Sequence, residues 1–202
     1  MSTPPWLTFI GIDPSLRATG LVTWRSGRWF TTTIVTGPST PRPARHHAIA
    51  MRILAMASPG GYRRGEAATL AIMEARITPA DVGAVQTAMD LAELRGVINH
   101  ALHVQGVPVV EVHPSTLKVY ATGTGRASKQ DMLLAARGRL GEHLHVANDD
   151  EADAAWLTAM AVHRYVRPLC ALPARNVAAM DRIKWPPLTP ETGTTVLRIG
   201  AK

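Results

Sequence analysis

The first part of the chain alternates short apolar runs with turn residues. Apolar and β-branched residues fill positions 7–13, 19–25 and 28–35, and Gly, Ser or Pro stands between successive runs. Runs of this length with such boundaries are typical of strands joined by tight connections. A proline-containing linker then leads to 44–57, where apolar residues recur at helical spacing. The pattern predicts a three-strand meander followed by an amphipathic helix.

From residue 68 onward, apolar runs of strand length alternate with longer helical patterns. Strands are predicted at 68–75 and 107–112, because both runs are largely apolar, as buried parallel strands are. Helices are predicted at 83–104, from Pro114, from Ser128 to about 140, and over 148–166 with Asn148 or Asp149 as the N-cap. The order β-β-β-α-β-α-β-α-α predicts an α/β fold, a mixed five-stranded sheet with helices on both faces.

Length and composition limit the class of protein. The 202 residues suffice for one domain, which we assign to 1–166, and a Pro-rich basic C-terminal extension over 167–202. A hydrophobic content of 46% and a charged content of 18% exclude wholesale disorder. The single cysteine, Cys170, the lack of a long apolar window and the lack of a signal-peptide pattern predict a cytoplasmic protein without a membrane partner. For the extension, a DNA-contacting arm, a dimer strap and a disordered tail remain alternatives.

Charge is distributed unevenly along the chain. The formal net charge is +7, and eight arginines but no acidic residue lie between Asp13 and Glu66. Such a segment favours contact with a polyanion such as a nucleic-acid backbone. A solvated surface that keeps the protein in solution is the alternative interpretation.

Four acidic residues stand at the ends of predicted elements that one sheet can bring together. Asp13 ends the first strand and Glu74 the fourth, whereas Asp150 and Asp153 lie in the first turn of the last helix and on one face of it. Burying several carboxylates together is costly unless a cation neutralises them. Because hard oxygen ligands suit Mg²⁺ or Mn²⁺, the sequence predicts a site for such ions.

Each acid also has a plainer interpretation. Asp13 precedes a proline and is suited to opening a turn. Glu74 fits an exposed strand end, and Asp149 or Asp150 fits a helix N-cap. Asp153 is harder to explain in this way, because it lies one turn inside the helix on its apolar side.

Five strings along the chain resemble the RuvC family of Holliday-junction resolvases, which has a ribonuclease H-like fold. They are GIDPSLRATG, MEARI, LAELRGVI, HPSTLKVYATGTGRASKQDM and DDEADAAWLTAMAVH, in the family's order and at similar spacing over roughly residues 7 to 166. The resemblance implies that Asp13, Glu74, Asp150 and Asp153 bind metal. It also implies that Lys118 and Lys129 lie near the scissile phosphate. The alternative is that each lysine is only a solvated helix residue.

The resemblance implies a function and a set of DNA contacts. The chain is expected to be a crossover junction endodeoxyribonuclease that resolves Holliday junctions and related branched DNA as a homodimer, with helix 83–104 at the dimer contact. Two Mg²⁺ ions per site, for which Mn²⁺ can substitute, would support hydrolysis of the phosphodiester bond. Ile77 stands where the family has an aromatic residue in a loop that approaches the junction core. The residues expected to contact DNA are Arg76, Ile77, Lys118, Arg126 and Lys129. The site of action would be the bacterial cytoplasm or nucleoid, or the host cytoplasm for a phage protein.

Two other functional classes share some of these features. One is a catalytically inactive module that binds branched DNA, although the presence of all four acids argues against it. The other is an actin-like sugar kinase or ATPase, which needs a second copy of the fold that 202 residues do not provide. The string TGTGRASK lacks the Gly-Lys-Ser/Thr ending of a phosphate-binding P-loop.

Overall fold

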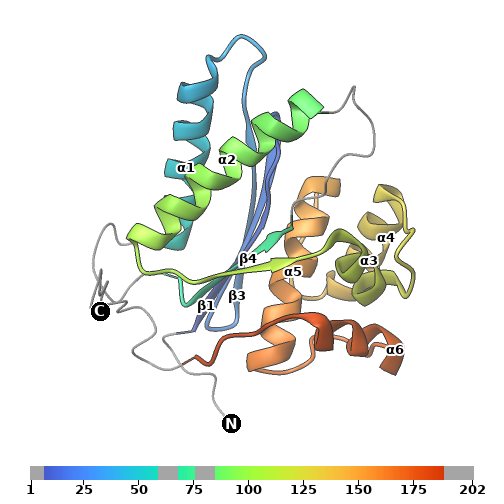
Figure 1. Ribbon diagram of the computed structural model, residues 1–202. Coiled ribbons are helices and arrows are strands. Elements are labelled where there is room, and N and C mark those ends of the chain that lie inside the picture. The colour runs from blue at the N-terminus through green and yellow to red at the C-terminus, as the bar shows by residue number, and fades with distance from the viewer. Residues whose placement is uncertain (1–6, 59–67, 76–84, 189–202) are drawn as a thin grey trace.

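The computed structural model describes residues 7–58, 68–75 and 85–188. A five-stranded mixed sheet forms its centre (Figure 1). The strands are β1 (Thr8–Asp13), β2 (Ala18–Arg25), β3 (Arg28–Val35), β4 (Leu70–Glu74) and β5 (Val109–Val112). Their order across the sheet is β3-β2-β1-β4-β5. β2 is antiparallel to both of its neighbours, β1 and β3, and β4 is parallel to both β1 and β5.

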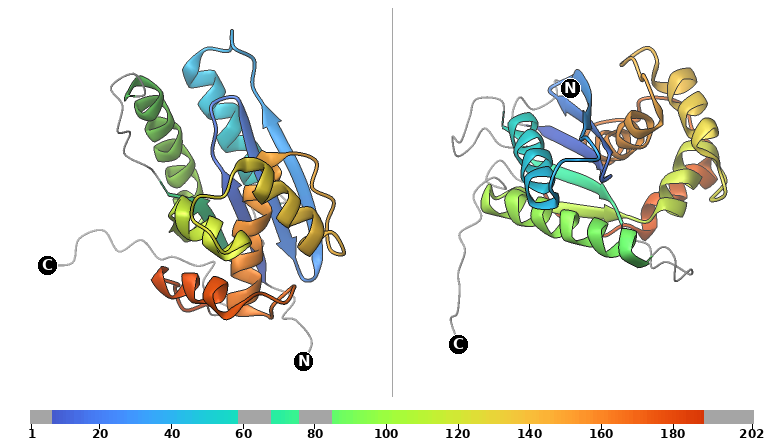
Figure 2. Two further views of the ribbon diagram at one scale, coloured as in Figure 1. Left: turned by 90° about the vertical axis from the view of Figure 1, so that its right-hand side faces the viewer. Right: turned by 90° about the horizontal axis from the view of Figure 1, so that it is seen from above.

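Helices cover both faces of this sheet (Figures 1 and 2). They are α1 (Arg42–Ala57), α2 (Val85–Val104), α3 (Pro114–Thr122), α4 (Lys129–Leu140), α5 (Asp149–Tyr165), α6 (Ala174–Val177) and the 3₁₀ helix η2 (Ala178–Arg182). One apolar core lies between the sheet and α1 and α2, and a larger one between the sheet and α3, α4 and α5. None of the helices within the described ranges is long and apolar enough to cross a bilayer.

The predicted fold and element order are confirmed. The observed elements begin and end within about two residues of the predicted ones, because turn and cap residues mark the boundaries. Ser128 forms a capping box with Asp131 at the start of α4. Asn148, one of two candidates, is the N-cap of α5, and its side-chain oxygen accepts a hydrogen bond from the Glu151 N–H at 2.9 Å.

The described part of the C-terminal extension packs on the domain. Met180 lies in the larger core, and Tyr165 stacks edge-to-face with Trp185 and donates a hydrogen bond to the Pro186 carbonyl at 2.6 Å. Asn176 is 1% exposed and donates to the carbonyl of Tyr120 in α3 at 3.0 Å. Residues 167–188 therefore brace α3 and the end of α5, while 189–202 lie outside the described residues.

Two glycines let α5 rest directly on the sheet. A Cβ atom at Gly11 would lie 2.1 Å from the Ala154 carbonyl oxygen, and one at Gly20 would lie 2.0 Å from that of Asp150. No other residue type fits at such distances. Because Gly20 pairs with Asp13 across β2 and β1, this contact brings the start of α5 to the end of β1.

Gly20→Ala is expected to destabilise the protein by about 2 to 3 kcal/mol and to lower its activity, because α5 must shift to accommodate the methyl group. Chemical denaturation measures the first effect and junction cleavage the second. Gly138→Ala is the matched control: a Cβ there meets nothing within 4 Å, so the better helix former is expected to stabilise α4 by about 0.5 to 1 kcal/mol. Equal stability of the two variants would contradict the close packing of α5 on β2.

Candidate active site

Parallel pairing of β1 with β4 brings Asp13 and Glu74 to one edge of the sheet. Ile12 pairs with Met73, so the next residue of each strand is an acid at the same carboxyl end. Both side chains are partly buried. The parallel pairing of β1 with β4 therefore makes neighbours of residues 61 positions apart in the sequence.

A polar network fixes the first turn of α5 beside that edge. The Glu151 carboxylate is 7% exposed and accepts hydrogen bonds from the Ala147 N–H at 2.9 Å and the Thr33 hydroxyl at 3.2 Å. Asn148 donates its side-chain N–H to the same hydroxyl at 3.0 Å. Because Glu151 is held against β3, the helix presents Asp150 and Asp153 toward Asp13, whose carboxylate interacts electrostatically with both.

The acids shift one another's protonation. Burial, then repulsion from Glu74, Asp153 and Asp150, raises the pKa of Asp13 well above its usual value. Burial, then the charge of Asp153, raises the pKa of Glu74 to about 7. Burial raises the pKa of Asp153 to about 6, and burial also raises that of Asp150. Such a concentration of carboxyl groups with raised pKa values is typical of a functional site.

The donor set fits a hard divalent cation. All four side chains offer carboxylate oxygens, and Asp153 Oδ1 is buried without a hydrogen-bond partner, which is costly unless a ligand satisfies it. Within the described ranges, no three His, Cys, Asp or Glu side chains already stand as a ligand shell.

Two lysines border the acids. Lys129, at the start of α4, donates to Asp149 Oδ2 at 2.7 Å and has its Nζ 3.9 Å from Asp150 Oδ1. Its charge offsets part of the rise that burial causes in the pKa of Asp13, Glu74 and Asp153. Lys118, in α3, acts likewise on Glu74 and Asp153. Both lysines thus lie close enough to the acidic group to act on its charge.

Of the three other residues that were predicted to contact DNA, the structure describes one. Arg126 lies exposed in the connection between α3 and α4, between the two lysine-bearing helices. Arg76 and Ile77 lie outside the described residues, so their contacts with DNA stay predictions.

Arg95 in α2 is a site residue that the sequence analysis did not single out. Its side chain is buried, and the guanidinium donates to the main-chain carbonyl of Glu74 and pairs with Glu111 Oε1 at 2.8 Å. The charge also lowers the pKa of Glu74. The sequence offered one signal for this role: in the string LAELRGVI, an arginine stands beside the apolar face of the predicted helix. Arg95 holds the end of β4 and so positions Glu74.

The chain is similar to known proteins over most of its length. The model of the family described as Crossover junction endodeoxyribonuclease RuvC matches residues 9–163. A relative of that name from Anaeromyxobacter sp. (strain Fw109-5) is 35% identical over 172 residues, covering 84% of this chain and 79% of the relative. Another, from Nitratidesulfovibrio vulgaris (strain DP4), is 33% identical over 129 residues, covering 62% of this chain and 73% of the relative.

Solved structures show the same fold, which is ribonuclease H-like. RuvC from Thermus thermophilus superposes with a TM-score of 0.60 at 22% identity, covering 78% of this chain and 96% of the other. T. thermophilus RuvC in complex with a Holliday junction substrate gives a TM-score of 0.61 at 20% identity, covering 80% and 97%. Since the family model spans most of the folded chain, this protein belongs to the Crossover junction endodeoxyribonuclease RuvC family.

Proposed function

We propose that this protein is a metal-dependent endonuclease that resolves Holliday junctions and related branched DNA. The supporting observation is that Asp13, Glu74, Asp150 and Asp153 share one electrostatic environment at the carboxyl edge of β1 and β4, in a chain of the RuvC family. Its relatives carry the name crossover junction endodeoxyribonuclease. Its site of action is the compartment that holds the DNA, the bacterial cytoplasm or nucleoid.

The four acids are proposed to hold the metal, with Mg²⁺ as the first candidate and Mn²⁺ as a substitute. When bound, a pair of such ions activates water and stabilises the leaving oxygen in phosphodiester hydrolysis. The protein's part is to hold the oxygens of Asp13 and Glu74 on the rigid sheet edge and those of Asp150 and Asp153 on α5. Lys118 and Lys129 would neutralise charge that develops on the phosphate.

Asp150 is the better fourth ligand than Asp149. The Asp149 side chain is 38% exposed and is engaged with Lys129, whereas that of Asp150 is 19% exposed and acts on Asp13. Hydrogen bonding to Lys129 lowers the pKa of Asp149, while burial raises that of Asp150. We infer that Asp149 positions Lys129 and that Asp150 faces the metal.

A homodimer is proposed to form through α2. Val85, Met89, Val97 and Val104 are exposed on this helix, opposite its buried residues Leu94, Ile98 and Leu102. A Cβ at Gly96, on the same exposed side, would meet nothing within 4 Å. Nothing among the described residues occupies this space, which leaves room there for a second helix. Two copies related by a two-fold axis would present two sites to opposing strands of a junction.

Met89→Glu is therefore expected to convert the dimer into a monomer, because a charge would be buried at the centre of the contact. Analytical ultracentrifugation reports the change in mass. Leu134→Glu is the matched control, since Leu134 is 59% exposed on α4 and its variant is expected to remain dimeric. A wild-type protein that is monomeric at micromolar concentration would contradict the assignment of α2.

The test of the function is a cleavage panel with Mg²⁺ on synthetic four-way, three-way, flap and linear duplex DNA. Selective, paired nicking of the four-way junction is the expected result. The truncated comparison protein should end at residue 188, because residues up to that point pack on the domain. Tight junction binding without cleavage, with either Mg²⁺ or Mn²⁺, would instead identify an inactive DNA-binding module.

A further inference from the structure

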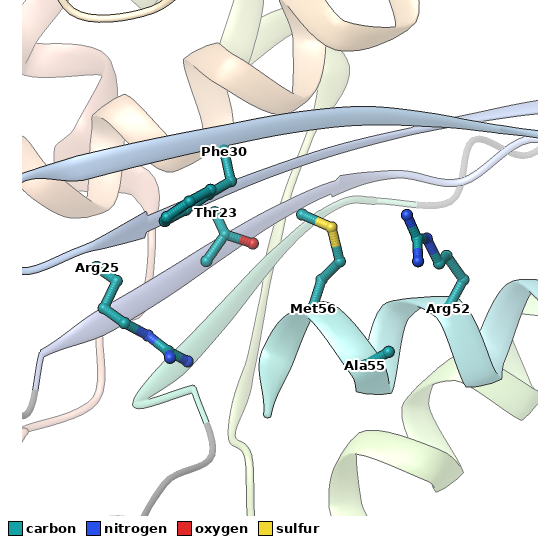
Figure 3. Close-up of a pocket in the computed structure, with 6 residues that line it drawn as sticks. All are labelled: Thr23, Arg25, Phe30, Arg52, Ala55 and Met56. Atoms are coloured by element: carbon teal, nitrogen blue, oxygen red, sulfur yellow. The ribbon is translucent and has the colours of Figure 1, made fainter. Parts of the chain in front are cut away.

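A second concave site lies on the face of the sheet opposite α5. Thr23, Arg25 and Phe30, from the antiparallel strands β2 and β3, and Arg52, Ala55 and Met56, from α1, line a cavity of about 320 Å³. Figure 3 shows Arg25 and Arg52 on opposite sides of Thr23 and Met56, with the Phe30 ring above. A volume of this order suits one small organic ligand.

Two polar groups of this cavity have no hydrogen-bond partner among the described residues. Thr23 is 2% exposed, and its hydroxyl oxygen is buried without a hydrogen bond. Arg25 donates through Nε to the Thr8 hydroxyl at 3.3 Å, which fixes the guanidinium, yet its Nη2 is buried and unpaired. Leaving such groups unsatisfied costs free energy that a ligand with acceptor atoms would recover.

The remaining lining residues define the ligand's chemistry. Two guanidinium groups and no carboxylate occur among the described lining residues, which selects an anion and suits phosphate in particular. Phe30 is 50% exposed, and with Met56 it offers an apolar surface on which a flat ring can stack. A nucleotide combines these features, because its phosphate is joined through the sugar to a flat, partly polar base.

The cavity is separate from the acidic site. Thr23 pairs with Ile10, whereas Gly20 pairs with Asp13, so the cavity lies about 10 Å further along β2. Alternate residues of a strand face opposite sides of the sheet. Leu21 packs in the core under α1 and α2 and Val22 in the core under α5, which places Thr23 on the α1 side.

We propose that this cavity, between β2, β3 and α1, binds one nucleoside monophosphate unit. The phosphate pairs with Arg52 at one end of the cavity, and the base lies against Phe30. At the other end, Arg25 and the Thr23 hydroxyl hydrogen-bond polar atoms of the sugar or base. The unit is either a free mononucleotide or the phosphorylated terminal nucleotide of a DNA strand, since both present the same groups.

Calorimetric titration with dTMP, in buffer containing EDTA, tests the proposal. One dTMP is expected to bind per chain, with thymidine and inorganic phosphate each at least about tenfold weaker because each lacks half of the recognised groups. Arg52→Gln is expected to weaken dTMP binding by about tenfold or more. Arg28→Gln is the matched control, since Arg28 is exposed on the same hairpin but outside the cavity lining, and it should change binding less than about twofold.

Thr23→Val separates a binding role from a folding role. It removes a buried hydroxyl that has no partner, so the variant without ligand should be at least as stable as wild type, while dTMP binding weakens by about fivefold. An oligonucleotide with a 5′-phosphate that displaces dTMP identifies the strand end as the ligand, and failure to displace it identifies the free nucleotide. No saturable binding of dTMP at millimolar concentration, or equal losses in Arg52→Gln and Arg28→Gln, would overturn the proposal.

Discussion

Asp153→Asn is expected to lower the rate of junction cleavage by at least about a thousandfold while changing junction affinity by less than about threefold. Asp153 contributes from α5 to the site that Asp13 and Glu74 form on the sheet, and its Oδ1 is buried without a partner. An amide in this position fills the same volume but cannot supply the negative charge that a divalent cation requires. Single-turnover cleavage with Mg²⁺ and a gel-shift assay with Ca²⁺ measure the two quantities separately.

The matched control is Asp181→Asn. Asp181 is an exposed acid in η2, remote from the acidic edge of the sheet, and its loss should leave the cleavage rate unchanged. The same experiment tests the choice of ligand, because Asp150→Asn should resemble Asp153→Asn. Cleavage by Asp153→Asn at the wild-type rate would contradict the proposal that α5 contributes Asp153 to the metal site.

Glu74→Gln is expected to stabilise the metal-free protein, and by an amount that grows as the pH rises. The pKa of Glu74 in the folded chain is about 7, above its usual value of 4.5, mainly because of burial and the charge of Asp153. The folded state thus holds its proton more tightly than the unfolded state, so the contribution to stability is present below about pH 4.5 and is lost as the pH rises through about 7. The advantage of the variant should reach about 2 kcal/mol at pH 8.

Urea denaturation from pH 5 to 8 in EDTA measures this difference, and the addition of Mg²⁺ should reverse it, because the ion binds only the folded wild type. Asp131→Asn is expected to change the stability in the opposite direction. Hydrogen bonds from Ser128 lower the pKa of Asp131, so this variant should lose stability above the pKa of the unfolded acid. A Glu74→Gln advantage that is constant across the pH range would mean that folding does not raise the pKa of Glu74.

Local patterns were sufficient to predict the fold. Several element boundaries carry a turn or cap residue, such as Ser128 or Asn148, whose effect does not depend on distant contacts. The convergence of Asp13 and Glu74 followed from the parallel pairing of two apolar strands. The spacing of Asp150 and Asp153 placed both on one face of a helix.

Features that depend on packing between distant segments could not be predicted in this way. Arg95 contacts the Glu74 main chain only because α2 lies across β4 and β5, and nothing in its local sequence specifies that crossing. The packing of residues 167–188 on α3 was likewise missed, since short proline-bounded turns have no periodic pattern. Gly20 was visible in the sequence, but the approach of α5 to it was not.

The bracing of α3 and α5 by residues 167–188 has a consequence for synthesis on the ribosome. Asp13 and Glu74 emerge early, but Met180, Trp185 and Leu188 pack on the core beneath α3 and α5 and are among the last packed residues to emerge. The nascent chain therefore completes its larger apolar core only when translation of the packed region is nearly finished.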